Sequence, residues 1–176
     1  WEPYIETEVK ILKQYFSKII IITNEEKSKI KQPIPYSIKI HRNAFKLNFY
    51  HRICSLKFIF TRIFISEILL IRNLYKQKIK LNNIRTLLVS MKTGELVSDF
   101  LENLVEKYEI PKESLVMYSF WNNNMSYGIS CLKKKLKKSI AISRAHRWDI
   151  FFEGNKGNYL PLRKEIQNNL DSIYFS

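Results

Sequence analysis

A group of chemically versatile side chains follows a short apolar run near the carboxyl-terminal end of this 176-residue sequence. The stretch SIAISRAHRWDIFFE, residues 139–153, places five such side chains within six residues: Arg144, His146, Arg147, Trp148 and Asp149. Histidine titrates near neutral pH and can share a proton with a sugar hydroxyl or a phosphate. Arginine binds phosphate and carboxylate oxygens through paired hydrogen bonds. These residue types predict a site for proton transfer or anion binding.

A purely structural interpretation of the same residues is also open. Asp149 can form an ion pair with Arg144, or it can orient the imidazole of His146. His146 itself can serve only as a cap for a neighbouring segment. A third arginine, Arg163, follows Pro161 and is a further candidate for binding an anionic group. The position of this loop in the fold decides between a binding site and a structural loop.

The elements around these residues alternate between strands and helices. Apolar β-branched runs and alternating patterns predict strands at 18–23, 36–41, 115–120, 139–143 and 172–176. Apolar residues at helical spacing predict helices at 4–16, within 45–80, and at 96–108, 125–136 and 162–170. This order predicts an α/β fold of Rossmann-like type, with a mainly parallel sheet and helices on both faces.

Two strand-to-helix connections have unusual polar content. They are SFWNNNMSYG at 119–128 and SRAHRWDIFFEGNKGNYLPLR at 143–163. Ligands of open parallel sheets bind beyond the carboxyl ends of the strands. We expect both connections at that one edge of the sheet, which favours a binding site over a structural loop.

The segment 40–92 is both apolar and basic, with eleven lysines and arginines against the single acid Glu67. Successive charges five residues apart turn by about 140° on a helix, so we expect them to surround its axis. No uncharged span approaches the ~20 residues that a membrane crossing needs. One interpretation is a set of solvated helix faces, and the other is a surface that docks on anionic lipid. The candidates for facing the membrane are Arg52, Lys57, Arg62 and Arg72.

Composition restricts the remaining possibilities. A formal charge of +14 predicts attraction to something anionic, whether nucleic acid, a phospholipid surface or a phosphorylated substrate. The chain has only four glycines and no phosphate-binding glycine loop or nucleophile elbow. Cys54 and Cys131 lie far apart without metal-type spacing, so we expect reduced thiols and no metal site. Nucleic acid is not expected as a partner, because no recognisable RNA- or DNA-binding motif is present.

Three stretches of the sequence together resemble the family 4 glycosyltransferases, which build bacterial capsule, O-antigen and exopolysaccharide chains. The stretches are YSFWNNNMSYGISCLKKK, ISRAHRWDIFFE and YLPLRKEIQNNLDSIYFS. Members of that family show a Y-S-Y-W-like loop, a strand that ends in R-A-H-x-x-D, an acid soon after it, and a P-[FL]-R helix start before an L-D-x-I strand. The resemblance covers nearly the whole chain and is weakest across 24–92.

The resemblance implies half of a GT-B fold, in which two Rossmann-like domains face each other across a cleft. Residues 1–176 would form a single acceptor-side domain that lacks its first strand. The carboxyl-terminal domain, which holds the nucleotide-sugar and carries a paired-glutamate motif, would then lie beyond Ser176. We therefore expect this fragment to be inactive alone.

The resemblance also implies a function. It is a retaining glycosyltransferase of hexosyltransferase type, which transfers a sugar from a nucleotide-sugar to a growing, lipid-linked surface polysaccharide. His146 would be catalytic, and no metal or cofactor is expected besides the nucleotide-sugar co-substrate. The residues expected to bind substrate are Arg144, Arg147, Asp149, Glu153, Arg163, Trp121 and Asn122.

The expected partners are a lipid-linked or oligosaccharide acceptor and an anionic membrane surface. The expected location is cytoplasmic, peripheral on the inner face of the plasma membrane. The alternative function is a non-catalytic basic module that binds anionic membrane or nucleic acid, and the excess of positive charge is compatible with both.

Overall fold

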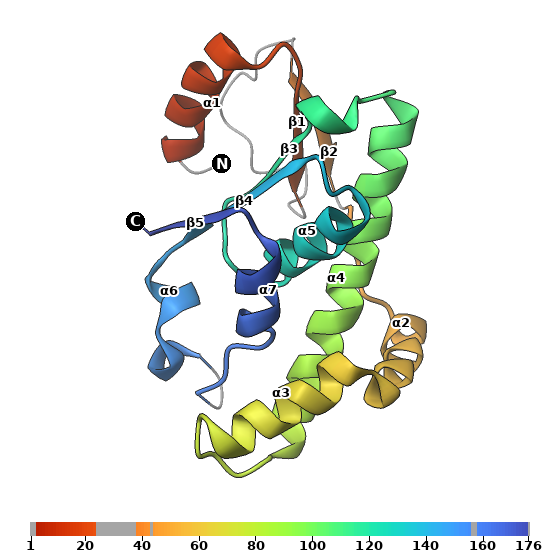
Figure 1. Ribbon diagram of the computed structural model, residues 1–176, viewed down its shortest axis with the longest axis vertical. Coiled ribbons are helices and arrows are strands. Elements are labelled where there is room, and N and C mark those ends of the chain that lie inside the picture. Colours follow the sequence, from red (N-terminus) through yellow and green to blue (C-terminus); the bar gives the residue numbers. More distant parts are fainter. Residues whose placement is uncertain (1–2, 24–37, 43, 156–157, 176) are drawn as a thin grey trace. The chain divides into compact units, whose positions relative to one another are not determined.

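The computed structural model describes residues 3–23, 38–42, 44–155 and 158–175 (Figure 1). The chain divides into two compact units, Trp1–Lys46 and Leu47–Ser176, and each is described by itself. Every strand ladder among the described residues is parallel. The prediction of a mixed α/β fold of Rossmann-like type with parallel strands is confirmed. The single domain expected over 1–176 stays a prediction.

The first unit contains one helix and two strands: α1 at Pro3–Tyr15, β1 at Ile19–Thr23 and β2 at Ile38–Arg42. Strand β1 is four isoleucines and a threonine, β-branched residues that fit a pleated surface better than a helix. It pairs with β2 from Ile19 opposite Ile38. The helix and strands expected here are confirmed, whereas the charged connection 24–35 lies outside the described residues.

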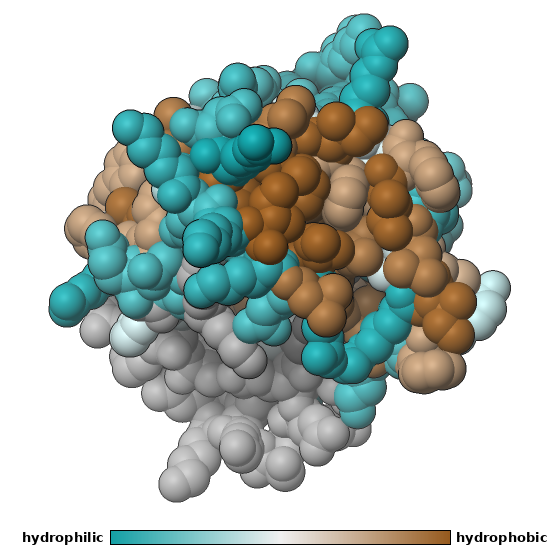
Figure 2. Space-filling model, turned by 90° about the horizontal axis from the view of Figure 1, so that it is seen from below, coloured by the Kyte–Doolittle hydropathy of each residue, from teal (hydrophilic) through white to brown (hydrophobic). Residues whose placement is uncertain are grey.

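The second unit begins with three short helices: α2 at Phe49–Cys54, the 3-10 helix η2 at Ser55–Phe60, and α3 at Arg62–Asn73. Polar side chains cap the starts of α2 and α3. The Asn48 side chain accepts a hydrogen bond from the His51 amide at 2.8 Å, and Thr61 accepts one from the amide of Phe64 at 3.3 Å. Figure 2 looks onto the side of the molecule that carries these helices, where much of the surface is apolar.

Charges do not surround the axis of a single helix in this segment, so that expectation is wrong. The segment is divided into three helices, and Glu67 on α3 is turned into the core, at 3% exposure. Arg62 and Arg72 on the same helix are exposed. The acid therefore lies on the buried side of α3 and both arginines lie on the exposed side.

The longest helix, α4, runs from Leu81 to Lys107 and starts well before the predicted residue 96. Its amino-terminal half buries polar residues such as Asn83 and Ser90 beside Leu87 and Met91, which hides the apolar periodicity in the sequence. No helix among the described ranges, α4 included, is long and apolar enough to cross a membrane.

Helix α5, Asn124–Lys135, packs closely on α4. A Cβ atom on Gly94 would overlap the ring of Tyr127, and one on Gly128 would overlap Val97. Two glycines that face the partner helix let the backbones approach to a distance that side chains would prevent. This contact fixes the position of α5 and of the loop before it.

The sheet of the second unit has the order β3-β4-β5, all parallel. Its strands are β3 at Val116–Ser119, β4 at Ile140–Ala145 and β5 at Ser172–Phe175. The short helix η3 at Lys112–Ser114 precedes β3, whereas α6 at Arg147–Ile150, η4 at Phe152–Gly154 and α7 at Arg163–Asn169 connect β4 to β5. The elements predicted from residue 115 onward are confirmed.

Two clusters of buried side chains hold the second unit together. One lies between the sheet and α5 and includes Met117, Leu132 and Ala141. The other joins α3, α4 and the chain before α7, and includes Ile71, Leu87, Met91, Tyr159, Leu162 and Ile166. The second cluster ties the basic, apolar segment to the connection that follows β4.

Candidate functional site

The two polar connections meet at the carboxyl edge of β3 and β4. The backbone amide of Asn122, in the first connection, donates a hydrogen bond of 3.0 Å to Asp149 Oδ2 in the second. Both residues are buried, with Asp149 at 8% exposure. The prediction that these connections share one sheet edge is confirmed.

Asp149 organises this edge through backbone amides. Its Oδ2 accepts from Asn122 and, at 3.4 Å, from the amide of His146. An ion pair with Arg144, the structural alternative considered for the sequence, is not among the contacts of Asp149 in the described part of the chain. A buried carboxylate is stabilised by hydrogen bonds to its charged form, so a pair of amides can replace a cation as its partner.

Three serines fix the backbone beneath Trp121. The Trp121 carbonyl accepts hydrogen bonds from Ser119 Oγ at 2.7 Å and from Ser126 Oγ at 2.8 Å. Ser126 Oγ also lies 2.7 Å from Ser143 Oγ on β4, in the interior. The sequence analysis did not identify these serines, although two of them flank the WNNN loop in the printed sequence. They hold the first connection against the sheet.

His146 packs against two aromatic rings. Its Nε2 lies 3.1 Å from the Phe120 carbonyl, and its ring centroid is 4.4 Å from that of Trp121 and 5.0 Å from that of Phe120. A carbonyl only accepts hydrogen bonds, so Nε2 is the donor in this contact. His146 is also the N-cap residue of α6, where its side chain and that of Asp149 form a capping box, as the structural alternative expected. Its Nε2 atom contacts the opposite loop as well.

Arg144 joins the same aromatic group from strand β4. Its guanidinium carbon lies 5.5 Å from the centroid of the Phe120 ring, within the range of a cation–π interaction. We call Phe120, Trp121, Asn122, Arg144, His146 and Asp149 the His146 network. Its members come from both connections and from the end of β4.

A pocket of about 690 Å³ lies beside this network, after β4. It is lined by Arg147, Trp148, Phe151 and Glu153. The predicted residues Arg147 and Glu153 therefore share one pocket with two exposed aromatic side chains, which are 64% and 54% exposed for Trp148 and Phe151. Neither aromatic residue was among the predicted substrate-binding residues, even though both lie within the stretch 139–153.

Arg163 lies in a different, buried environment at the start of α7. Its Nε and Nη1 atoms are buried and have no hydrogen-bond partner in the described part of the chain. Burial lowers the pKa of Arg163, while the nearby Asp149, Tyr75 and Glu67 oppose that shift. The guanidinium of Arg163 therefore acts on this region through its positive charge. Its electrostatic interaction with Asp149 connects it to the His146 network.

Glu67 is a buried carboxylate that the sequence reading did not place among the candidate site residues. Its Oε2 accepts hydrogen bonds from the Tyr159 hydroxyl at 2.8 Å and from the Leu162 amide at 3.0 Å. Burial raises the pKa of Glu67, and the two hydrogen bonds only partly oppose this shift. The signal was available, because Glu67 shares a helix face with the core residues Phe64 and Ile71.

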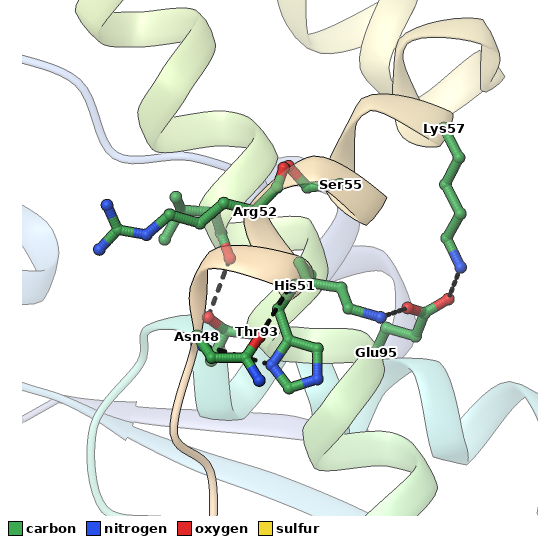
Figure 3. A network of polar contacts seen from close by, with 9 residues as sticks. Asn48, His51, Arg52, Ser55, Lys57, Thr93 and Glu95 are labelled. Atoms are coloured by element: carbon green, nitrogen blue, oxygen red, sulfur yellow. Dashed lines mark hydrogen bonds and ion pairs between the residues drawn. The ribbon is translucent and has the colours of Figure 1, made fainter.

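The candidate membrane-facing cations lie on the three short helices, and one of them is paired. Figure 3 shows Lys57 in an ion pair with Glu95 of α4, and Lys92 binds the same carboxylate. The hydrogen bonds and cations around Glu95 lower its pKa, although its partial burial acts in the opposite direction. Arg52, Arg62 and Arg72 are exposed on α2 and α3.

Metal-binding groups and cysteines add little to this picture. Within the described ranges, no group of three or more histidine, cysteine or acidic side chains is placed to hold a metal ion. Cys54 and Cys131 are free thiols, as expected from the sequence. Burial raises the pKa of Cys131, which makes it less reactive than an exposed thiol.

No protein-family model, no curated protein and no solved structure matches this chain. The resemblance to family 4 glycosyltransferases therefore stays a prediction. A functional proposal has to rest on the residues described above and on their geometry.

Proposed function

We propose that this chain is the acceptor-side domain of a retaining glycosyltransferase that extends a lipid-linked surface polysaccharide. The observation that carries this proposal is the His146 network, which places an imidazole, a guanidinium and two aromatic rings at the carboxyl edge of a parallel sheet. That edge is where open α/β sheets bind their ligands. The motif resemblance around residues 144–149 is the second support.

Each part of the site suits a carbohydrate acceptor. The exposed rings of Trp148 and Phe151 offer apolar surface to the faces of a sugar, whereas Arg147 and Glu153 can bind its hydroxyl groups or an attached phosphate. A pocket of about 690 Å³ falls in the usual range for small-ligand sites. His146 would act at the reacting centre, and Asp149 would hold its backbone in place.

The proposed reaction consumes a nucleotide-sugar, a co-substrate that the second domain of such an enzyme would bind. A lipid-linked acceptor would place the enzyme in the cytoplasm, peripheral on the inner face of the plasma membrane. The exposed arginines and apolar residues of α2 and α3 support that location. The alternative is a non-catalytic module that binds anionic membrane or nucleic acid. The same charges support it, but it assigns no function to the His146 network.

The decisive experiment measures sugar transfer by the complete gene product with His146→Ala. We expect transfer to a membrane-lipid extract to fall by a factor of about 10²–10⁴, the usual contribution of a general acid or base. The matched control is Lys138→Ala, because Lys138 forms a surface ion pair with Glu113 away from the sheet edge. Unchanged transfer by a folded His146→Ala enzyme would remove the histidine from the mechanism.

A second variant tests the pocket separately. Trp148→Ala should raise the KM for the acceptor and leave kcat nearly unchanged, because the ring offers binding surface and no proton. Equal losses in kcat for Trp148→Ala and His146→Ala would contradict separate roles.

The gene sequence after Ser176 provides an independent check, since the proposal requires a second Rossmann-like domain with paired glutamates there.

A further inference from the structure

The helices α2, η2 and α3 expose large apolar side chains to an unusual extent. Phe60 is 88% exposed, Phe49 78% and Tyr50 69%, and Ile65 and Leu69 are each 52% exposed. Figure 2 shows apolar surface that continues across this side of the molecule, with hydrophilic side chains around it. Single exposed apolar residues are ordinary, but a continuous patch marks a binding surface.

The outward side of α3 has a regular pattern. Arg62, Ile65, Leu69 and Arg72 fall within about 80° of one another around the helix axis, so they form one stripe. All four are exposed, whereas Phe64, Glu67 and Ile71 on the opposite side are buried. A cation therefore stands at each end of an apolar stripe, so the outward side of α3 offers both the apolar and the basic residues with which helices bind a membrane interface.

The charges on this side are all of one sign. Residues 47–92, all of which the structure describes, contain a single acid, Glu67, and its carboxylate is bonded to Tyr159 and Leu162 in the core. The exposed charges of the segment are arginines and lysines. The cations nearest to an acid are Lys57 and Lys92, and both bind Glu95. These charges attract an anionic partner, and no exposed carboxylate of this segment would oppose it.

The combination of residues selects lipid over other anionic or apolar partners. Nucleic acid would satisfy the arginines but would leave isoleucine, leucine and phenylalanine in water. A second copy of this chain would cover the apolar residues but would bring the cations of both copies together. A bilayer with anionic headgroups accepts apolar side chains at the depth of its acyl chains and cations at its surface.

We propose that the outward side of α2, η2 and α3 docks on a membrane surface rich in anionic lipid. We call this surface the docking face; its anchors are Phe49, Tyr50, Phe60, Ile65 and Leu69, and its cations are Arg52, Arg62 and Arg72. The helices lie along the surface and do not cross the bilayer. Only the purpose of docking, access to a lipid-linked acceptor, rests on the function proposed above.

The test is co-sedimentation of the 176-residue chain with vesicles. We expect binding to vesicles of phosphatidylcholine with about one-third phosphatidylglycerol, and much weaker binding to pure phosphatidylcholine, since each cation near an anionic surface contributes on the order of 1 kcal/mol. Arg62→Gln with Arg72→Gln should then weaken binding by about 25-fold at low salt, which is about fivefold for each cation. Phe49→Ser with Phe60→Ser should weaken it by at least about tenfold.

Matched controls carry the same substitutions elsewhere on the surface. Phe175→Ser changes a phenylalanine that is 71% exposed on β5, and Lys107→Gln with Lys112→Gln removes two exposed cations outside the docking face. We expect each control to change vesicle binding by less than about twofold. Losses as large as those of the docking-face variants would overturn the proposal, because binding would then follow total charge or total apolar surface.

Two other results would also overturn it. One is tighter binding to nucleic acid than to anionic vesicles, and the other is a dimer in sedimentation velocity that Phe49→Ser with Phe60→Ser dissociates. Vesicle binding is measured without any sugar, so it separates the two proposals. If the 176-residue chain binds vesicles but the complete gene product transfers no sugar, the result counts against the proposed enzyme alone. If the complete gene product transfers sugar but the 176-residue chain does not bind vesicles, the result counts against the docking face alone.

Discussion

The His146 network and the docking face use similar residues in opposite ways. Both combine aromatic side chains with arginines. In the His146 network a buried acid, Asp149, binds backbone amides, and the rings of Phe120 and Trp121 pack against an imidazole. In the docking face the only acid is turned into the core, and rings such as that of Phe60 lie in solvent.

This difference indicates what each region is prepared to bind. A backbone fixed by hydrogen bonds and rings packed against one another hold functional groups in one geometry, as a site for a defined ligand requires. Exposed apolar anchors with flexible cations suit a partner without a fixed shape, such as a lipid surface. The two regions should therefore respond differently to substitution, and the variants below test that difference from the largest expected effect to the smallest.

Asp149→Ala should give the largest loss of stability. It leaves the amides of Asn122 and His146 without their buried acceptor, and it removes the acid nearest to the charge of Arg163. We expect the free energy of unfolding to fall by about 2–4 kcal/mol, as measured by urea denaturation. Asp99→Ala, which removes an exposed acid on α4, should change it by less than about 0.5 kcal/mol. Equal values for the two variants would show that Asp149 does not organise the sheet edge.

Gly128→Ala should have the next largest effect. The added methyl group would overlap Val97 and force α5 away from α4, together with the loop that carries Trp121. We expect a loss of about 1–3 kcal/mol, reduced by the better helix propensity of alanine. Thermal denaturation gives the stability, and a change in tryptophan fluorescence would report movement of the loop. A gain in stability would mean that α4 and α5 separate at little cost.

Glu67→Gln should produce a smaller effect that depends on pH. The pKa of Glu67 is raised on folding, so the folded chain binds its proton more tightly, and this contribution to stability is lost as pH rises from the unfolded value through the folded one. Glutamine keeps an oxygen for Tyr159 and Leu162 without the charge. The stability of the variant relative to the natural chain should therefore increase with pH across that window.

The measurement for Glu67→Gln is a series of urea denaturation midpoints from about pH 4.5 upward. Glu106→Gln, in which an exposed acid of α4 is changed, is the control and should run parallel to the natural chain. A Glu67→Gln profile that is parallel to both would place Glu67 outside the buried cluster.

Phe60→Ser should have the smallest effect on stability. The side chain is 88% exposed, so its removal leaves no cavity, and we expect a change below about 0.5 kcal/mol. The same change should still reduce vesicle binding. A large loss of stability would show that Phe60 packs within the folded chain, and the contrast between the two regions would then fail.

Several features of the site could be predicted from the sequence because they follow from local patterns. The isoleucines of β1 and the alternation in β4 are properties of a few neighbouring residues, and they place Arg144 and His146 at a strand end. The start of α4 could not be predicted in this way. Buried polar residues, such as Asn83, interrupt the apolar pattern there, so the periodicity does not reveal the buried side of the helix.

The sequence by itself determined the class of fold, the parallel arrangement of the strands and the sheet edge at which polar residues gather. Only the tertiary structure decided that Asp149 binds amides in place of Arg144. It also decided that Glu67 is buried, so that the charged residues of the docking face are all cations. The physical reason is the range of the interactions. Periodicity is a pattern among residues that are close together in the chain. The partner of a buried carboxylate can instead lie far away in the sequence, as Leu162 does from Glu67.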